Sequence, residues 1–356
     1  MTIRLEADAA RGTDEAPGPW MRSVFKSPSG GERVRRPALV RRALAVAVTS
    51  AFLLHWADDT SAIAKGLWGG RDQEMSLKAL DLEFGIYDPH SRAVASSRFQ
   101  LEHIFVAWQS PDEGVLDGKI ADVNSAGRSM MISVEPFTHA ADWRTGGDRL
   151  FADILAGGYD TEINGVCRKA RAVQSRVYMR WGHEMEDVDG RYPWARRDPA
   201  GYRKAFAYFV ERCRKVLPNA RYVWSPKGHK NLDAYYPGDR HVDVIGLPVW
   251  GLERMDIDYW NHPRGFSDTF AEKYDRVAHF GKPIMVAELG VAGSLKYKHS
   301  WYEEIFAPRA IAERFPLLIG ISFFNDKEPY HWPMGYGSPD WRLDPKTLAR
   351  LRPPRS

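Results

Sequence analysis

The sequence has 356 residues, of which 44% are hydrophobic and 27% are charged, so it is long enough for one large domain or two ordinary ones. Both proportions are ordinary for a soluble globular protein. The formal net charge of +4 comes largely from residues 33–42, which contain five arginines and no acid. The rest of the chain is nearly neutral, which excludes a nucleic-acid-binding surface in the folded part.

The first 42 residues form a basic segment, and residues 1–38 are rich in Arg, Gly, Pro and Ser with little apolar periodicity. We expect this segment to be disordered. Residues 43–54 are apolar or small, and they are too few for a membrane span, which needs about 20 residues. They fit the apolar core of an export signal, and Ala62 and Ala64 supply a cleavage pattern.

Residues 43–64 are therefore predicted to be a signal peptide or a membrane anchor. The protein is expected to be secreted or periplasmic, or attached to the inner membrane by this segment, with a mature amino terminus near Lys65 if the signal is cleaved. Two features fit a signal poorly: the long polar segment before it, and Asp58 and Asp59 beside the cleavage pattern. A mis-assigned start codon or an uncleaved anchor would explain either one.

Residues 65–350 alternate short apolar runs with longer amphipathic segments, as expected of one domain with alternating strands and helices. Eight runs are predicted to be strands: residues 84–87, 103–108, 130–135, 176–180, 221–224, 242–247, 283–287 and 317–324. Helices between strands imply parallel pairing, and this count fits a (β/α)8 TIM barrel better than an open sheet. No Gly-rich phosphate loop follows the first run, which disfavours a nucleotide-binding sheet.

Three helices are clear from their patterns. The best defined follows Asp198, an N-cap with Pro199 at the first helical position, and ends near Leu217. A second, before the fourth strand, places Cys167 on its apolar face, and a third begins at Asp268. The first of these helices carries Cys213 on its apolar face. The two cysteines could form a disulfide in an exported protein, but small buried thiols need no partner, and we expect them to be free.

The active site of such a barrel lies at the carboxyl ends of its strands. Polar and aromatic residues end or follow several of the predicted strands: Trp108, Glu135, Glu184, Trp250, Glu288, Asn325, Asp326 and Trp332. Three carboxylates and several tryptophans around one rim favour a site that handles sugars.

The stretch from residue 176 to 194 is the most informative one. A short apolar strand turns polar at its end, where Arg180, His183 and Glu184 follow one another closely. Charged groups at a strand end are costly to bury, because each needs a partner or a pKa shift. Tyr192 and Trp194 would add a flat apolar wall for a sugar ring. The alternative is a buried ion pair that closes a loop.

Two carboxylates that flank a glycosidic bond are the usual minimum for its hydrolysis. Glu184 and Glu288 are the best pair, because each stands at a predicted strand end before a loop. Glu135 is a third candidate, and pairing with Arg180 or another base at the barrel mouth is an equally good explanation for it.

The order and spacing of several motifs resemble glycoside hydrolase family 26, the β-mannanase-type enzymes, over about residues 80 to 345. The most specific pair is His183-Glu184-Met185 and the block that ends in Glu288-Leu289-Gly290, with the two glutamates 104 residues apart (288 − 184). Further matching segments are residues 158–160, 180–185, 192–194, 198–199 with Tyr202, 222–226, 235–239, 242–246 and 281–290.

The resemblance implies a retaining β-glycanase that cleaves internal bonds of a β-linked polysaccharide. Glu184 would be the acid/base and Glu288 the nucleophile, while Arg180 and His183 would position substrate or carboxylates. The two carboxyl groups should then lie about 5–5.5 Å apart. We expect cations to keep the pKa of Glu288 low and the charge of Glu288 to raise that of Glu184. The resemblance implies no metal and no organic cofactor.

The chain departs from the family pattern where the substrate would lie. Asp189-Gly190 stands in for the usual Asn-Gly, and Arg191 follows where an aromatic is common. Trp250 occupies the place of a Tyr that supports the nucleophile, and an indole has no hydroxyl. β-Mannan, mixed-linkage or β-1,4-glucan, β-xylan and an endogenous exopolysaccharide all stay open as substrates. Trp108, Glu135, Tyr192, Trp194, Trp250 and Trp332 are the expected substrate-binding residues.

Other functional classes fit less well. The acidic residues Glu186, Asp187 and Asp189 could bind calcium, but their spacing matches no loop signature and favours a solvated acidic loop. His183-Glu184 lacks the second histidine of a zinc helix. The main alternative is a non-catalytic barrel that binds polysaccharide during exopolysaccharide synthesis or export. Such a barrel would keep the tryptophans and lose a carboxylate, whereas both carboxylates are present.

Overall fold

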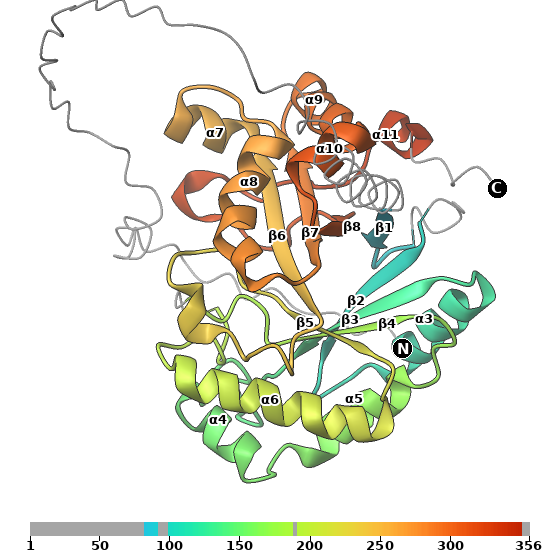
Figure 1. Ribbon diagram of the computed structural model, residues 1–356, viewed down its shortest axis with the longest axis vertical. Helices are drawn as coiled ribbons and strands as arrows, with labels where there is room; N and C mark the ends of the chain where they lie inside the picture. Colours follow the sequence, from blue (N-terminus) through green and yellow to red (C-terminus); the bar gives the residue numbers. More distant parts are fainter. Residues whose placement is uncertain (1–81, 92–98, 188–190, 351–356) are drawn as a thin grey trace, which may run out of the picture.

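The computed structural model describes residues 82–91, 99–187 and 191–350. Eight parallel strands pair in chain order and close into a barrel, with β1 hydrogen-bonded to β8 (Figure 1). The strands are β1 Glu83–Tyr87, β2 Leu101–Ala107, β3 Ser129–Glu135, β4 Val177–Trp181, β5 Arg221–Trp224, β6 Val244–Leu252, β7 Ile284–Ala292 and β8 Leu318–Phe324. The prediction of a (β/α)8 TIM barrel is confirmed. The predicted segments 1–42 and 43–64 lie outside the described residues.

Two strands are longer than the sequence predicts. β6 and β7 stay paired as far as Leu252 and Ala292, across a register shift at Leu247/Pro248. Glu288 and Trp250 therefore lie inside these strands, and the prediction that Glu288 ends a strand and that Trp250 follows one was wrong. The register of β7 shifts beside Glu288, and such irregularities change the direction of a side chain. Glu288 can therefore face the barrel mouth from inside a strand.

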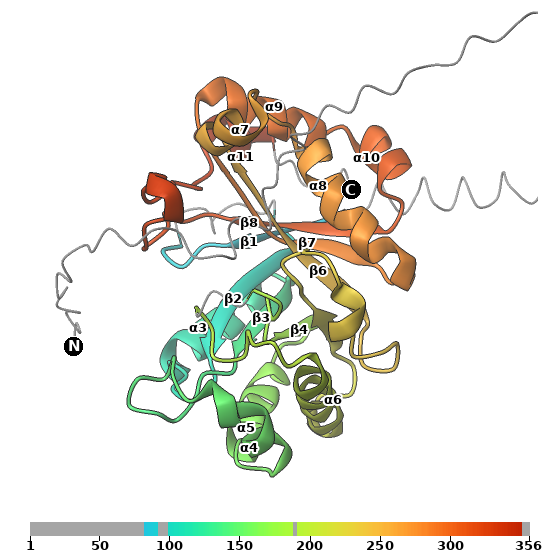
Figure 2. The same ribbon diagram turned by 90° about the vertical axis from the view of Figure 1, so that its left-hand side faces the viewer.

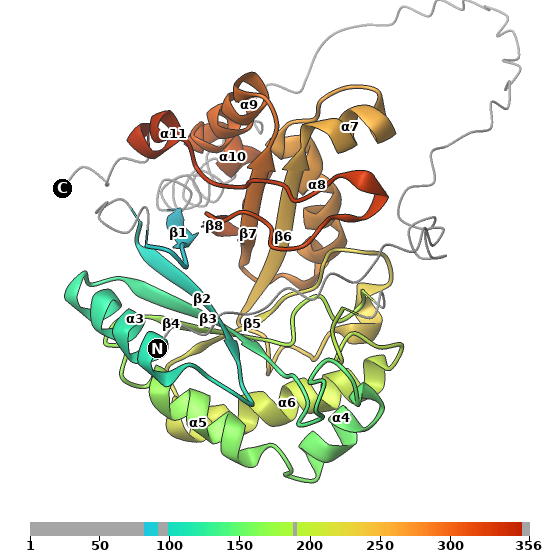
Figure 3. The same ribbon diagram turned by 180° about the vertical axis from the view of Figure 1, so that it is seen from behind.

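The α-helices lie on the outside of the barrel in two groups. Figures 2 and 3 show α3 to α6 on one side of the strands and α7 to α10 on the other. The α-helices are α3 Glu113–Ser125, α4 Gly147–Leu155, α5 Asp160–Ala170, α6 Pro199–Val216, α7 Glu253–Trp260, α8 Phe266–Val277, α9 Leu295–Ile305, α10 Pro308–Arg314 and α11 Pro345–Arg350. Short 3-10 helices are η1 Leu232–Tyr235, η2 Ala278–Phe280 and η3 Pro333–Gly335.

The local sequence signals explain where these helices begin. The side chain of Asp198 caps α6 by accepting from Gly201 N–H, as its position before Pro199 predicts. α8 begins at Phe266, two residues before the predicted start, with Gly265 as its N-cap. The described connection from β5 to β6 contains η1 and no α-helix, so the loop after β5 is free to approach the barrel mouth.

Cys167 of α5 and Cys213 of α6 form a disulfide, with 5.5 Å between their Cα atoms. The expectation of two free thiols was wrong, because α5 and α6 pack as neighbours and bring both apolar faces together. No helix among the described residues is long and apolar enough to cross a bilayer.

The inside of the barrel changes from apolar to polar along its axis. Leu101, Met131, Tyr178, Val223, Val244 and Met285 form an apolar layer contributed by six strands. Because side chains alternate along a strand, the residues two positions further point into the same interior. On β2, β3 and β4 and just after β5 these are His103, Ser133, Arg180 and Ser225, which we call the polar layer. All four side chains are buried.

Candidate active site

Arg180 organises the polar layer and is fully buried. Its Nε donates to Ser225 Oγ at 2.8 Å, and its Nη1 donates to Ser133 Oγ at 2.9 Å. Ser225 Oγ in turn donates to the carbonyl of Gly246 at 2.8 Å. The space for Ser225 exists because residue 246 is glycine; a Cβ there would lie 3.2 Å from Ser225 Oγ and 2.9 Å from a methyl of Val223. Hydroxyl groups on β3 and just after β5 thus fix the guanidinium that β4 carries.

His103 completes the polar layer as a neutral imidazole. Its Nε2 lies 2.8 Å from Ser133 Oγ. Because that hydroxyl already accepts from Arg180, its own proton is available for His103 Nε2. Burial and the charge of Arg180 both lower the pKa of His103 well below its usual value, which agrees with a neutral ring.

Glu288 forms an ion pair with Nη2, the third nitrogen of the Arg180 guanidinium. The carboxyl oxygen Oε1 lies 2.6 Å from Arg180 Nη2 in a buried ion pair. β7 is irregular beside this residue, since its register with β8 shifts between Val286 and Leu289. A buried charge of this kind is retained only when it is paired, so Arg180 is the group that keeps a carboxylate possible here.

Glu184 is held by a different kind of structure, a loop that follows β4. Gly182 and Glu184 both have positive φ angles, 55° and 54°, and this conformation is uncommon for glutamate. The N–H of Glu184 donates to the carbonyl of Ser225 at 2.8 Å, and Glu184 O accepts from Asp187 N–H at 3.0 Å. The turn therefore places the Glu184 backbone directly on the segment that follows β5.

The carboxylates that follow Glu184 secure this loop. Glu186 Oε1 accepts from the N–H groups of Gly228 and His229 at 2.9 and 3.2 Å, and Asp187 forms an ion pair with Lys227. Asp187 is buried, so the prediction of a solvated acidic loop was wrong for these two residues. Asp189 lies outside the described residues. Among the described residues no cluster of three His, Cys, Asp or Glu side chains is arranged to hold a metal ion.

The pKa values of the two glutamates shift in directions opposite to those expected. Burial raises the pKa of Glu184, but Lys227, Arg191, Arg180 and Lys273 together lower it below its usual value. Burial raises the pKa of Glu288; Arg180 opposes this effect and the charge of Glu184 adds to it. The expectation failed because it placed the cations beside Glu288 alone. In the free protein, a single proton on the pair therefore resides mainly on Glu288.

The aromatic residues near Glu184 form a stack. Tyr192 lies flat on Trp194, with ring centroids 4.5 Å apart, and Tyr192 Oη is 3.2 Å from His183 Nε2. Trp194 is fully buried and donates its indole N–H to the carbonyl of His183 at 2.7 Å. Trp194 therefore supports the site from below, and its predicted place as an exposed sugar-stacking wall was wrong. Tyr192 keeps part of its surface exposed.

Trp108 also lies in the core and not on the rim. Its indole N–H donates to Phe137 O at 2.7 Å, and its ring stacks on Tyr159 with centroids 5.0 Å apart. Only 2% of the residue is exposed, so it has no face for a sugar. The prediction that Trp108 binds substrate directly was wrong, and the residue packs in the core. β2 ends one residue earlier, at Ala107, and the indole turns outward against α5 and the turn before it.

Trp250 and Trp332 remain partly exposed and lie together at the mouth. Trp250 covers Gly290, where a Cβ would come 2.5 Å from the indole, two residues beyond Glu288 on the same strand. Trp332 lies in the segment between β8 and α11, which passes over β6 and β7 in Figure 3. Both rings contact the buried Trp341, which fixes their orientation.

Glu135, at the end of β3, belongs to the same mouth. Burial raises the pKa of Glu135 to about 7; Glu288 adds to this rise, and Arg191 and Arg180 oppose it. Tyr87, at the end of β1, faces the charges of Asp326, Glu135 and Glu288 and was not predicted. Its position as the last residue of the first strand could have placed it at the mouth from the sequence.

Some buried polar atoms at the mouth have no hydrogen-bond partner within the described protein. They include Nδ1 of His183. Buried polar atoms are normally satisfied, so atoms of this kind beside two carboxylates are suited to the hydroxyl groups of a ligand. With a guanidinium, two glutamates and partly exposed indoles nearby, the arrangement has the groups required for acid–base and nucleophilic chemistry on a sugar.

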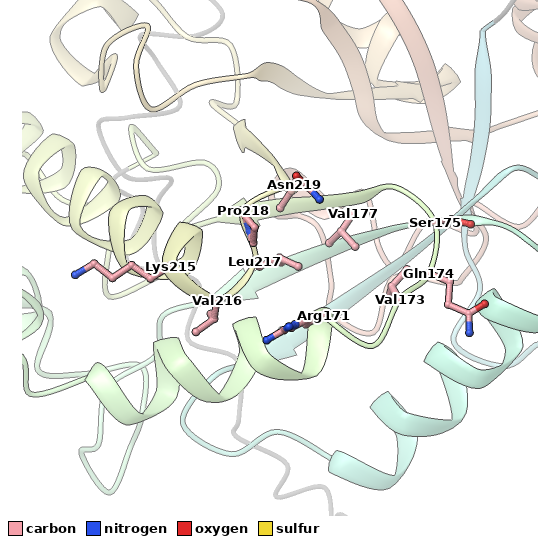
Figure 4. Close-up of a pocket in the computed structure, with 11 residues that line it drawn as sticks. Arg171, Val173, Gln174, Ser175, Val177, Lys215, Val216, Leu217, Pro218 and Asn219 are labelled. Carbon is pink, nitrogen blue, oxygen red and sulfur yellow. The ribbon is translucent and has the colours of Figure 1, made fainter.

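A separate cavity of about 410 Å³ lies at the opposite end of the barrel (Figure 4). It is formed where α5 and α6 end and where β4 and β5 begin, and it is lined by residues such as Arg171, Val177 and Leu217. It contains no carboxylate, which distinguishes it from the mouth.

Comparisons with known proteins agree with this geometry. The sequence pattern of Glycosyl hydrolase family 26 matches residues 161–305, which include Glu184 and Glu288. Endoglucanase H of Acetivibrio thermocellus is 24% identical over 310 residues, 82% of this chain and 30% of that protein. A β-1,3-xylanase of a Vibrio species is 21% identical over 53% of this chain and 44% of that protein. The chain thus spans less than half the length of these two relatives.

A solved structure supports the same fold. A β-mannanase of this family from Bacteroides ovatus superposes with a TM-score of 0.55 at 15% identity, covering 78% of this chain and 89% of that one. At that identity the likeness concerns the fold alone. Residues 161–305, which include both glutamates, thus carry the sequence pattern of glycoside hydrolase family 26, and they do so on a barrel of the same fold as that β-mannanase.

Proposed function

We propose that the protein is a retaining β-glycanase in which Glu288 is the nucleophile and Glu184 is the acid/base. The observation that carries the proposal is the pair of buried glutamates in unlike settings, one in a strand against Arg180 and one in a loop against lysines. Unlike settings separate the protonation behaviour of two carboxyl groups, as the two roles require.

In the first step the Glu288 carboxylate attacks the anomeric carbon while Glu184 gives its proton to the leaving oxygen. A glycosyl ester of Glu288 forms and the glycosidic bond breaks. Arg180 holds the attacking carboxylate and accepts the loss of its charge without moving, since Ser133 and Ser225 fix the guanidinium. In the second step Glu184, now ionised, takes a proton from water, which attacks the anomeric carbon and releases Glu288.

The free protein favours the proton on Glu288, so substrate binding has to populate the reactive form, with the proton on Glu184. A neutral sugar that enters the mouth displaces water from Glu184 and favours its uncharged form. The two carboxyl groups must lie about 5–5.5 Å apart for this mechanism.

For the substrate we propose a β-linked polysaccharide cleaved at internal bonds. β-Mannan and mixed-linkage or β-1,4-glucan are the first candidates, because the relatives named above include an endoglucanase and a β-mannanase. β-Xylan and an exopolysaccharide of the host belong in the same panel. Trp250, Trp332 and Tyr192 would stack on sugar rings, His183 would meet a hydroxyl, and Glu135 would bind at the rim.

The two alanine variants separate the roles of the glutamates. Glu184→Ala should retain activity on an aryl glycoside whose leaving group needs no proton, and azide should accelerate its second step. Glu288→Ala should lose turnover on both kinds of substrate, and azide should give the inverted glycosyl azide. Near-normal polysaccharide turnover by Glu288→Ala would contradict the assignment. Binding of polysaccharide without new reducing ends would instead support a non-catalytic barrel.

We also propose that residues 43–64 direct export. Fractionation of the host should place the barrel outside the cytoplasm, in free form if the segment is cleaved and in the membrane fraction if it is kept. A full-length protein found only in the cytoplasm would contradict export.

A further inference from the structure

Lys273 reaches the active site from a helix on the outside of the barrel. It lies in α8, and its Nζ donates to the carbonyl of Pro248 at 2.6 Å. Pro248 is the β6 residue paired with Glu288 of β7. An ammonium from the outer layer thus ends one strand away from the proposed nucleophile, and the proposed mechanism does not use it.

The path of this side chain is shaped by Gly228. A Cβ at residue 228 would lie 2.9 Å from Lys273 Cγ and 3.0 Å from Cδ, and the φ of Gly228 is +96°. The carbonyl of Gly228 accepts from Arg276 of α8, while its N–H donates to Glu186. α8 therefore holds residues 227–229, and these hold the loop that carries Glu184.

The charges that face Lys273 come from several elements. Glu184 and Glu186 attract the ammonium from the loop after β4, while Lys227 and Arg276 repel it. His229 faces the same group, and Asp187 lies against both His229 and Lys227. Burial and these repulsions lower the pKa of Lys273 to about 8, and Glu184 is the largest opposing effect. The ammonium in turn is one of the four cations that lower the pKa of Glu184.

We propose that Lys273 is a positioning residue for the reaction, whose fixed ammonium biases Glu184 toward its ionised form and holds its loop in place through Gly228. The inference depends on the proposed acid/base role of Glu184. An ionised Glu184 is the form that activates water in the second step, so the lysine favours release of the glycosyl enzyme. The same bias lowers the pH up to which Glu184 keeps the proton that the first step requires.

The test is the pH dependence of kcat/KM in Lys273→Met, measured on polysaccharide and on an aryl glycoside with a good leaving group. Loss of the cation should move the alkaline limb on polysaccharide upward by at least about half a pH unit. The limb should stay in place on the aryl glycoside, whose first step needs no proton. Lys273→Arg keeps the charge and should keep the wild-type limb.

Lys298→Met is the matched control, because Lys298 is also half-buried and donates only to backbone carbonyls, those of Asp340 and Arg342 at 3.4 and 3.3 Å. It should leave the limb unmoved. If Lys273→Met does not fold, Lys273→Gln keeps a donor to Pro248 and serves instead. A folded variant with an unmoved alkaline limb on polysaccharide overturns the inference. If Glu184→Ala is not rescued by azide, the proposed function fails instead, so the two failures are distinct.

Discussion

Glu288 and Glu184 are held by two different kinds of structure. Glu288 lies in a strand against a guanidinium that β3, β4 and the end of β5 fix from inside the barrel. Glu184 lies in a strained loop fixed by other loops and by α8. The difference indicates that the barrel interior positions Glu288, the proposed nucleophile, while the outer layer influences Glu184, the proposed acid/base. The two glutamates should therefore respond to different substitutions.

Arg180→Met should produce the largest effect, because it leaves Glu288 buried without a cation. We expect kcat to fall by about a thousand-fold or more on every substrate, activated or not, and the free energy of unfolding to fall by about 3–5 kcal/mol. Activity assays and denaturant unfolding measure both. Arg176→Met is the control, since Arg176 lies on the far end of the barrel beside Glu83. Wild-type kcat in Arg180→Met would contradict the role of the polar layer.

Gly228→Ala should disturb only the Glu184 side. The new methyl would clash with the Lys273 side chain, and alanine disfavours the positive φ of residue 228, so the loop must shift. We expect kcat on polysaccharide to fall about ten- to a hundred-fold, with a much smaller loss on an activated aryl glycoside. Gly238→Ala is the matched control, because its φ is +94° and nothing lies within 4 Å of the new Cβ. Equal losses on both substrates would show that the effect is not specific to Glu184 as the proposed acid/base.

The same contrast explains what the sequence predicts. Parallel strands buried on both faces are apolar runs, so all eight strands were predicted, although β6 and β7 extend five residues beyond their predicted ends. The arginine at the end of the fourth run was recognised because a charge there is unusual. Ser133 and His103 were missed, since a single polar residue in an apolar run has no distinctive pattern, and so was Ser225, a lone serine just after such a run. Only the closed barrel brings them together around Arg180.

Residues on helices and loops were harder to predict. Lys273 looks like any lysine on an amphipathic helix, and its path beneath Gly228 is a tertiary feature. Cys167 and Cys213 lie on two apolar faces whose contact depends on how α5 and α6 pack. Trp108 was assigned to the rim because a strand end predicts position along the axis but not the direction of a side chain, and Trp194 because its aromatic type does not show whether a loop buries it.

The last predicted effect concerns stability and not activity, and it lies at Glu135, the carboxylate at the end of β3. Its pKa in the folded protein is about 7, above that of an unfolded glutamate, so the folded state binds the extra proton between about pH 4.5 and 7. This proton contributes stability at low pH that is lost as pH rises through 7. Glu135→Gln should flatten that dependence, by at most about 1.4 kcal/mol per pH unit. The free energy of unfolding is measured at several pH values for both proteins. The same dependence on pH in Glu135→Gln as in the wild type would contradict the prediction.

The division of roles between the two glutamates is tested most directly by trapping the covalent intermediate. The protein is incubated with activated 2-deoxy-2-fluoro glycosides of manno and gluco configuration, digested, and mapped by mass spectrometry. Formation of the glycosyl enzyme should outpace its hydrolysis, so a single label should accumulate. We predict that it lies on the peptide that contains Glu288 and that Glu184 stays unlabelled. A label on Glu184 or Glu135 would contradict the account, because the nucleophile would then not be the carboxylate held by Arg180.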